Sequence, residues 1–171
     1  MILRIRQATI SDVNIISALG VTTCYEAYFE LDPSNDLADY CAFAFNPEQM
    51  KAELEDANST FLIAEWNGKA VGYAKLRENN LIECLKDKNA VEVQRVYVLE
   101  KMKGKHIGEK LMTRCFEIAG EKGCEMLWLG VWEKNVAAIK FYAKLGMANV
   151  GTTDFSDGKS SFINLVMAKK T

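Results

Sequence analysis

The chain has 171 residues, of which 49% are hydrophobic, so it has the size of one ordinary domain with a substantial buried core. Its formal net charge of −2 argues against a general electrostatic preference for nucleic acid or for an anionic membrane. The first residues, MILRIRQATI, lack the apolar segment of a secretory signal peptide, and no apolar run approaches membrane-spanning length. We therefore expect one cytoplasmic domain over residues 1–171, without a nucleic-acid or membrane partner.

The cysteines of the chain are typical of reduced thiols. Their number is odd, no two are spaced as Cys-x-x-Cys, and most stand in apolar surroundings. Disulfide frameworks and zinc sites need paired spacings, so we expect neither of them and no bound metal. The cysteines are Cys24, Cys41, Cys84, Cys115 and Cys124.

The start of the chain predicts a strand followed by helices. Residues 3–8, LRIRQA, alternate apolar and polar side chains as a strand does. Ser11 is a candidate N-cap for a helix that runs to about Tyr28. Pro33 and Pro47 then separate short helices within an acidic and aromatic stretch.

A further helix and a hairpin come next. The helix is expected from Glu48 to about Ala57. After it, the strand-like runs TFLIAEW and KAVGYAKL are separated only by Asn67 and Gly68. Asn-Gly between two such runs is the strongest short-range signal for a β-hairpin, so we predict an antiparallel pair of strands.

The second half of the chain predicts a parallel crossover and a final hairpin. AVEVQRVYVL alternates like a strand, LMTRCFEIA has helical spacing, and EMLWLGVW is as apolar as a central strand. Strand, helix and strand make one right-handed crossover. The helix KNVAAIKFYAKLG, closed by Gly146, and two strands around the turn SDGK complete the chain. The predicted fold class is α/β, of the α+β kind, with one mixed sheet.

A basic turn, KMKGKHIGEK, precedes the predicted helix of the crossover. The first N–H groups of a helix are unpaired and lie at the positive end of its dipole, so a glycine-containing turn before a helix suits an anion. The spacing does not fit a P-loop, because Glu109 stands where a second glycine is required. It does not fit the dinucleotide fingerprint G-x-G-x-x-G either.

The order of these segments resembles the GNAT superfamily of acetyl-CoA-dependent N-acetyltransferases. VQRVYVL, the basic turn, IGEKLM, LWLGVW and EKNVAAIKFYAKLGM follow one another as they do in that family. The resemblance covers essentially the whole chain. It implies a single-domain GNAT-like fold, with a mixed central sheet of about seven strands, flanking helices, and acetyl-CoA as the co-substrate.

In that family, backbone amides of a Gln/Arg-x-x-Gly-x-Gly/Ala turn hold the pyrophosphate of coenzyme A. Lys103 replaces the Gln or Arg of this pattern, and His106 replaces its first glycine. Glu109 follows directly, and we include it in the implied coenzyme site. The six matching residues are Lys103, Gly104, Lys105, His106, Ile107 and Gly108.

The resemblance also implies where the pantetheine arm of the coenzyme binds. The alternation of AVEVQRVYVL predicts only a strand. The family likeness adds that this strand diverges from its neighbour and contacts the arm through the backbone around Val96, Tyr97 and Val98.

Tyr142 is the candidate general acid. Asn135, Ala138 and Tyr142 match the Asn-x-x-Ala-x-x-x-Tyr pattern of the family, and their spacing places them on one helix face. The likeness implies that the tyrosine hydroxyl protonates the leaving thiolate and that Asn135 contacts the coenzyme arm. Lys144 is added to the coenzyme site. The alternative for Tyr142 is a partly buried aromatic residue that only packs.

Three stretches point to one group within the superfamily. WLGVWEKN, AIKFYAKLGM and AFNPEQMKAEL resemble the PaiA-type polyamine (spermidine/spermine) N-acetyltransferases of Gram-positive bacteria. Carboxylates and aromatic faces suit alkylammonium groups through ion pairing and cation–π contact, and both kinds of residue gather in the early helical segment. The expected substrate-binding residues are Tyr25, Glu26, Tyr28, Asp36, Gln94 and Trp132.

The general base is less defined than the acid. Glu92 and Gln94 share a face of their strand, and the PaiA-like register puts Gln94 where a glutamate is expected. A glutamine cannot take a proton, so Glu92, a chain of waters, or an amine that arrives deprotonated must serve. The alternative for Glu92 is a solvated carboxylate at a strand edge.

The sequence leaves several alternatives open. The acceptor could instead be a protein N-terminus, a lysine or another small amine, because one fold serves all of these. A regulator that binds acetyl-CoA with little turnover is an alternative from another class. A homodimer is among the assemblies that the sequence allows.

Overall fold

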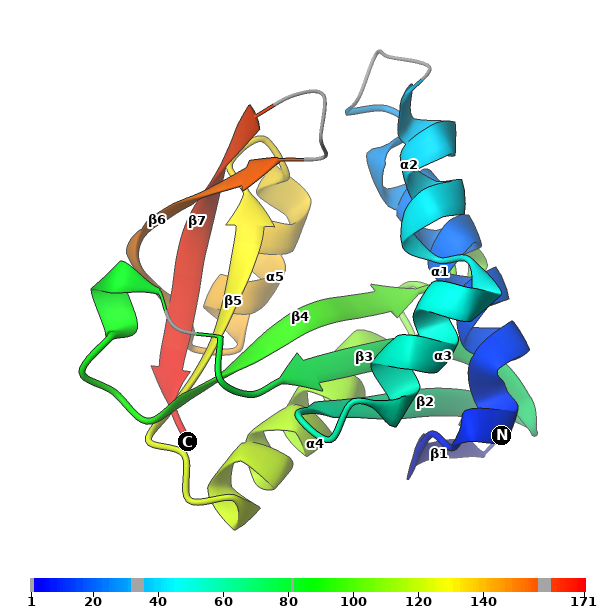
Figure 1. Ribbon diagram of the computed structural model, residues 1–171, viewed down its shortest axis with the longest axis horizontal. Helices are drawn as coiled ribbons and strands as arrows, with labels where there is room; N and C mark the ends of the chain where they lie inside the picture. Colours follow the sequence, from blue (N-terminus) through cyan, green and yellow to red (C-terminus); the bar gives the residue numbers. More distant parts are fainter. Residues whose placement is uncertain (1, 32–35, 81, 157–160) are drawn as a thin grey trace. The chain divides into compact units, whose positions relative to one another are not determined.

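The computed structural model describes residues 2–31, 36–80, 82–156 and 161–171 (Figure 1). The chain divides into two compact units. The first unit comprises Met1–Leu76 and Arg95–Cys115, and the second comprises Arg77–Gln94 and Phe116–Thr171. The expectation of one domain over residues 1–171 therefore stays a prediction.

One seven-stranded sheet runs through the described residues in the order β1-β2-β3-β4-β5-β7-β6. β4 pairs parallel with β5, whereas β1 with β2, β5 with β7 and β6 with β7 are antiparallel. The predicted mixed sheet and its flanking helices are confirmed. The strands are β1 (Leu3–Gln7), β2 (Ser59–Trp66), β3 (Lys69–Arg77), β4 (Ala90–Val98), β5 (Met126–Trp132), β6 (Ala148–Ser156) and β7 (Ser161–Lys170).

The helices follow the predicted order. Three short 3-10 helices, η1 (Ile10–Asp12), η2 (Glu83–Leu85) and η3 (Glu100–Met102), stand at the connections. No helix in the described ranges is both long and apolar enough to span a membrane. The α-helices are α1 (Val13–Tyr28), α2 (Asp36–Ala44), α3 (Pro47–Glu55), α4 (Ile107–Glu121) and α5 (Val136–Lys144).

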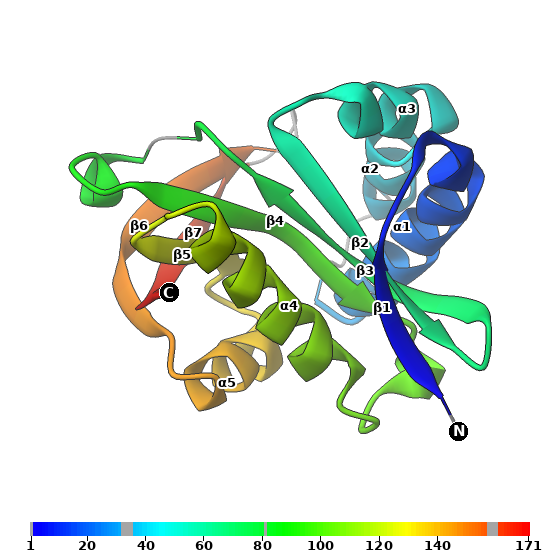
Figure 2. The ribbon, with the colours of Figure 1, turned by 90° about the horizontal axis from the view of Figure 1, so that it is seen from below.

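Helices α1, α2 and α3 cover one side of β1–β3 in the first unit, and the first half of α4 lies on the other side (Figure 2). The three helices and the strands share one apolar core because their inward side chains are almost all hydrophobic. Burial of this surface is the main stabilising contribution. The buried members of the core are Ile16, Leu19, Cys24, Leu37, Cys41, Phe45, Met50, Phe61, Ile63 and Tyr73.

The predicted hairpin between β2 and β3 is confirmed. Asn67 and Gly68 have φ values of 49° and 78°, the left-handed conformation that a two-residue hairpin turn requires. The side-chain oxygen of Asn67 also accepts a hydrogen bond from the N–H of Ile2 at 3.0 Å. The turn is thereby tied to the start of β1.

The start of α1 differs from the prediction. Ser11 was expected to be the N-cap, and this is wrong, because Asp12 precedes the helix. Arg6 donates two hydrogen bonds of 2.8 Å to the Asp12 carboxylate, and the N–H of Thr9 donates a third of 2.8 Å. These bonds, above all those from Arg6, lower the pKa of Asp12 to about 2. A carboxylate held this firmly sets the helix entry, and Ser11 lies within the preceding η1 helix.

Helix α3 begins and ends slightly earlier than predicted. Asn46 is its N-cap, whose side-chain oxygen accepts a hydrogen bond from the N–H of Gln49 at 2.9 Å. Pro47 occupies the first turn, where its missing N–H costs nothing. The helix ends at Glu55, two residues before the expected Ala57.

The second unit joins the start of β4 to β5, β7 and β6. Ala90–Glu92 pairs with Met126–Trp128, and both strands continue beyond these residues. A register shift between Asn149 and Gly151 interrupts β6 where it pairs with β7. Residues 157–159 of the expected turn SDGK, like Pro33, lie outside the described residues, and Ser156 is the last residue of β6.

Gly146 closes helix α5 as predicted. Its φ of 82° lets the N–H of Met147 reach the carbonyl of Tyr142 at 3.2 Å, while its own N–H reaches Ala143 at 3.0 Å. This pair of bonds is the Schellman motif, which satisfies the last carbonyls of a helix. Lys169 of β7 donates to the carbonyl of Leu145 at 2.8 Å. The end of α5 is therefore fixed to the sheet of its own unit.

The turn before α4 contains two left-handed residues. Gly104 has a φ of 76° and His106 a φ of 59°. The left-handed region costs a non-glycine residue about 1–2 kcal/mol. The carbonyl of His106 accepts the N–H of Lys110 at 3.1 Å, and its ring nitrogen Nδ1 lies 3.0 Å from Glu109 Oε2. These bonds hold the histidine at the start of the helix in spite of the strain.

We expect Gly72→Ala to destabilise the protein by about 1–3 kcal/mol, as overpacking does. An added Cβ would lie 2.6 Å from the Tyr97 carbonyl oxygen and 3.2 Å from the Val98 Cα, so the backbone of β4 would have to move. Urea unfolding measures the loss. The control is Gly120→Ala in α4, where a Cβ meets nothing within 4 Å, and it should stabilise by about 0.5–1 kcal/mol. A Gly72→Ala protein as stable as the wild type would contradict the close approach.

We expect His106→Gly to be more stable than His106→Ala by about 1 kcal/mol, because both remove the imidazole but only glycine relieves the left-handed strain. The difference in free energy of unfolding between the two variants measures it. An alanine variant that matches or exceeds the glycine variant would contradict the left-handed conformation.

Candidate functional site

The basic turn and the start of α4 form the first candidate element, in the first unit. The opening N–H groups of α4 have no partner within the helix, and the helix dipole makes this end positive. Gly104 has open space where a side chain would be. Backbone N–H groups at such an end, with Ile107, Gly108 and Glu109 in the first turn, are suited to the oxygens of a phosphate.

The lysines of the turn are partly engaged. Lys103 forms an ion pair with Glu100, which neutralises its charge locally. Lys105 holds its ammonium 5.5 Å above the ring of Trp66 at the end of β2, a cation–π contact. The positive character of the turn therefore depends more on the N-terminal end of α4 than on the number of its lysines.

The segment before the turn is tied to neighbouring elements. The N–H of Leu99 donates to the carbonyl of Val71 in β3 at 3.0 Å. The N–H of Glu100 donates to the carboxylate of Glu26 in α1 at 2.9 Å. Glu26 was predicted to bind substrate, and the structure places its carboxylate on this backbone group.

The other predicted substrate residues of α1 and α2 lie near the ends of those helices. Tyr25 is exposed, and its ring centroid lies 5.6 Å from that of Phe29. Tyr28 is half-buried at the last position of α1, and Asp36 is half-buried at the first position of α2. The end of one helix and the start of the next thus supply aromatic and acidic side chains.

A buried group of charges that the sequence did not reveal lies beside β4. Arg95 donates to Glu53 of α3 at 2.6 and 3.1 Å, and Lys75 of β3 donates to Glu53 at 2.7 Å. Burial alone would raise the pKa of Glu53, but the hydrogen bond and charge of Arg95 outweigh it and the pKa is lowered. Arg95 also lies 4.9 Å above the ring of Phe45. The only sequence signal was charged residues placed inside strand-like runs.

The coenzyme-arm residues predicted on β4 lie next to this group. Tyr97 packs its ring 5.9 Å from that of Tyr73, and burial raises the pKa of Tyr97 well above its usual value. Val96 and Val98 are half-buried. The hydroxyl of Tyr73 is buried and has no hydrogen-bond partner among the described residues.

The two polar residues at the start of β4 belong to the second unit. Glu92 is buried and accepts hydrogen bonds of 2.8 Å from both Arg77 and Asn80. Its carboxylate is thus neutralised rather than solvated, and its role as a base stays a prediction. The side-chain oxygen of Gln94 is buried and has no partner among the described residues. An unpaired buried acceptor of this kind suits an N–H donor from a ligand.

Helix α5 carries the predicted acid. Asn135 is the N-cap, and its side-chain oxygen accepts the N–H of Ala138 at 3.1 Å. Asn135, Ala138 and Tyr142 are all half-buried, as expected for one helix face, whereas Lys144 is exposed. The ring of Tyr142 packs edge-on against Phe141 at 5.2 Å. Caps at both ends of α5 therefore fix the helix that carries Tyr142.

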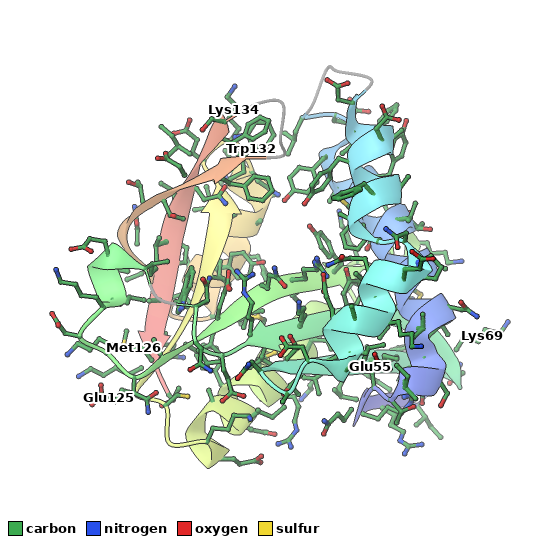
Figure 3. All side chains as sticks on the ribbon, viewed as in Figure 1. Glu55, Lys69, Glu125, Met126, Trp132 and Lys134 are labelled. Atoms are coloured by element: carbon green, nitrogen blue, oxygen red, sulfur yellow. The ribbon has the colours of Figure 1, made fainter. Side chains whose placement is uncertain are left out.

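Trp132 ends β5 within an aromatic group of the second unit. Its ring meets that of Phe162 edge-on at 5.4 Å, and Phe155 lies 6.4 Å from Phe162. The ammonium of Lys134 lies 5.5 Å above the Trp132 ring (Figure 3). This group offers flat apolar surface, which a ligand chain could contact.

The structure brings together some predicted residues but leaves others in separate units. The turn from Lys103 to Glu109 and the substrate residues of α1 and α2 lie in the first unit, while Glu92, Gln94, Trp132 and Tyr142 lie in the second. In the first unit the N–H of Glu100, next to the turn, bonds to Glu26. In the second unit Asn135 caps the helix that carries Ala138 and Tyr142. The assignment of their roles stays a prediction.

Comparison with known proteins identifies the family. The model of the acetyltransferase (GNAT) family matches residues 23–147. An uncharacterized N-acetyltransferase of Lactobacillus delbrueckii subsp. lactis is 27% identical over 170 residues, which cover 97% of this chain and 96% of the relative. An uncharacterized N-acetyltransferase of Mycobacterium tuberculosis is 32% identical over 117 residues, which cover 68% of this chain and 70% of the relative.

A solved structure shows the same fold. The PaiA N-acetyltransferase from Thermoplasma acidophilum, in complex with coenzyme A, is similar with a TM-score of 0.78 and 21% identity, and the match covers 100% of both chains. The sheet order, the basic turn before α4 and the family match over most of the chain agree with one another. This chain belongs to the GNAT family and is an acetyl-CoA-dependent N-acetyltransferase.

Proposed function

We propose that this acetyltransferase transfers the acetyl group to a primary amine of a polyamine such as spermidine or spermine. The observation that carries the proposal is the placement of Tyr25 and Tyr28 in the last turn of α1 and of Asp36 at the first position of α2, the next helix of the chain. Aromatic faces and a carboxylate are the groups that stabilise alkylammonium ions. The similarity to a PaiA N-acetyltransferase and the amino-acid sequence of the second half of the chain support the same acceptor class.

The proposal assigns the two ends of the coenzyme to different parts of the chain. The pyrophosphate is assigned to the N–H groups of the turn from Lys103 to Glu109, because a helix end with left-handed residues presents several donors at once. The pantetheine arm is assigned to the backbone of Val96, Tyr97 and Val98, together with Asn135, Ala138 and Lys144. Acetyl-CoA supplies the activated thioester.

The reaction needs a general acid, a deprotonated amine, and a hydrogen-bond acceptor that orients the amine. Tyr142 is proposed to give its proton to the departing thiolate, after direct attack by the amine on the thioester carbonyl. The side-chain oxygen of Gln94, which has no partner in the described part of the chain, is proposed to accept an N–H of the incoming amine. Glu92 is proposed as the base, which Arg77 would have to release, or to act through water.

Tyr142→Phe is expected to lower kcat about 100-fold while the affinity for acetyl-CoA changes little, because only the proton donor is lost. Steady-state kinetics with spermidine and calorimetry with coenzyme A measure the two quantities. Tyr40→Phe removes a hydroxyl from the first unit and serves as the control, with kcat expected within about twofold of wild type. An unaltered kcat in Tyr142→Phe would remove the residue from the chemistry.

Asp36→Lys is expected to raise KM for spermidine by about 2–10-fold and to leave KM for acetyl-CoA unchanged, as reversal of one partly exposed charge does. Asp87→Lys, an exposed carboxylate that follows η2, is the matched control and should change neither constant. Equal constants for Asp36→Lys and wild type would remove Asp36 from the acceptor site.

The acceptor itself is tested by release of coenzyme A thiol from acetyl-CoA, with spermidine, spermine, putrescine, lysine peptides, an aminoglycoside and no amine. Turnover strongest with spermidine or spermine supports the proposal. Stronger turnover with a peptide or aminoglycoside assigns another acceptor. No turnover, together with a melting temperature raised by acetyl-CoA, would support the regulatory alternative.

A further inference from the structure

We infer that Glu26 positions the phosphate-binding turn and does not bind the acceptor amine. The inference rests on the proposed function, which assigns the coenzyme phosphates to the turn from Lys103 to Glu109. It departs from the expectation of the sequence, which placed Glu26 among the substrate residues because it is acidic and stands between two tyrosines.

The contact that carries the inference is a hydrogen bond between backbone and side chain. The N–H of Glu100 donates to Glu26 Oε2 at 2.9 Å, across 74 positions of sequence. Glu100 is the first residue of η3, which follows β4 after a single residue, Leu99. An N–H at the start of a helical turn has no partner inside it, so a carboxylate from another element acts as its cap.

Glu100 is also bonded to the first residue of the turn, so a shift of Glu100 would move the turn. Its carbonyl accepts the N–H of Lys103 at 3.0 Å, and its carboxylate forms an ion pair with the ammonium of Lys103. Lys103 is the first of the six residues that match the coenzyme turn. Three groups of one residue, Glu100, therefore connect helix α1 to the beginning of the turn.

The other described hydrogen bonds of this segment do not hold the N–H of Glu100. Leu99 is held to β3 through Val71, and Met102 is buried and donates its N–H to Leu99 at 2.8 Å. These bonds secure the entry and the middle of η3. Glu26 alone, among the described contacts, holds the N–H of Glu100 from outside the segment. Its loss would loosen the turn without opening the core, because Glu26 is exposed.

A positioning role for Glu26 predicts an effect on the phosphate-bearing ligand and none on the acceptor. The carboxylate carries a negative charge, which would not assist phosphate binding by direct contact. It contributes through the geometry that it imposes on Glu100. An uncharged residue with the same acceptor oxygen should therefore serve nearly as well as the native one.

The test compares Glu26→Ala and Glu26→Gln with wild type. Calorimetry gives Kd for coenzyme A and for 3′-phosphoadenosine 5′-diphosphate, its nucleotide portion with the complete pyrophosphate, and kinetics give KM for acetyl-CoA and for spermidine. Glu26→Ala should weaken both phosphate ligands by the same factor, about 3–10-fold, with KM for spermidine unchanged. Glu26→Gln should restore both affinities to within about twofold of wild type, because its amide oxygen accepts the same N–H.

Glu55→Ala is the matched control. Glu55 is an exposed carboxylate of the first unit, at the end of α3 (Figure 3), and its replacement should change none of the four constants. Circular dichroism of each variant checks that the fold is retained.

Three outcomes would overturn the inference. A raised KM for spermidine with unchanged Kd for coenzyme A would return Glu26 to the acceptor site. Unchanged constants throughout would leave the hydrogen bond without function. Weaker binding of coenzyme A with unaltered binding of 3′-phosphoadenosine 5′-diphosphate would place the effect away from the phosphates. Calorimetry needs no acceptor, so a failure of the polyamine proposal leaves this test intact.

Discussion

The ion pair between Arg95 of β4 and Glu53 of α3 is the interaction on which the functional parts of the first unit depend. Both side chains are largely buried, 13% and 12% exposed, and removing Glu53 would leave the Arg95 charge uncompensated at a cost of about 3–5 kcal/mol, whereas Lys75 would still pair with Glu53 if Arg95 were lost. The pair fixes β4 against α3, which shares its apolar core with α1 and α2, the helices that carry the acceptor candidates. Because β4 leads through Glu100 into the basic turn, its position also sets where the turn begins.

Backbone geometry fixes two of the segments that are assigned to the coenzyme, one in each unit. In the turn, His106 adopts the left-handed conformation itself although it stands where the family pattern has glycine. In α5, the Asn135 cap and Gly146 hold the helix that carries Tyr142 at its two ends. Side chains can therefore depart from the family pattern while the N–H groups and the tyrosine keep their places.

The sequence predicted the features whose signals are local. Asn67-Gly68 and Gly146 were foreseen because a left-handed turn restricts the residues that can occupy it. The helix start at Asp12 was missed because its choice over Ser11 depends on Arg6, on another element. Pairings between distant positions, such as Arg95 with Glu53 and Glu100 with Glu26, leave no pattern along the chain. The same limit applies to the site, where residue types were predicted but their partners were not.

The register shift in β6 has a consequence for how copies of this enzyme behave at high concentration. β6 is an end strand of the sheet, and an end strand offers unpaired backbone groups to which another chain can add. Val150, at the shift, and Phe155 are both exposed, which would favour such addition. A bulge bends the strand and breaks the regular spacing that a second strand must match. At the opposite edge, the short β1 carries the exposed Arg4, whose charge opposes the same kind of polymerisation.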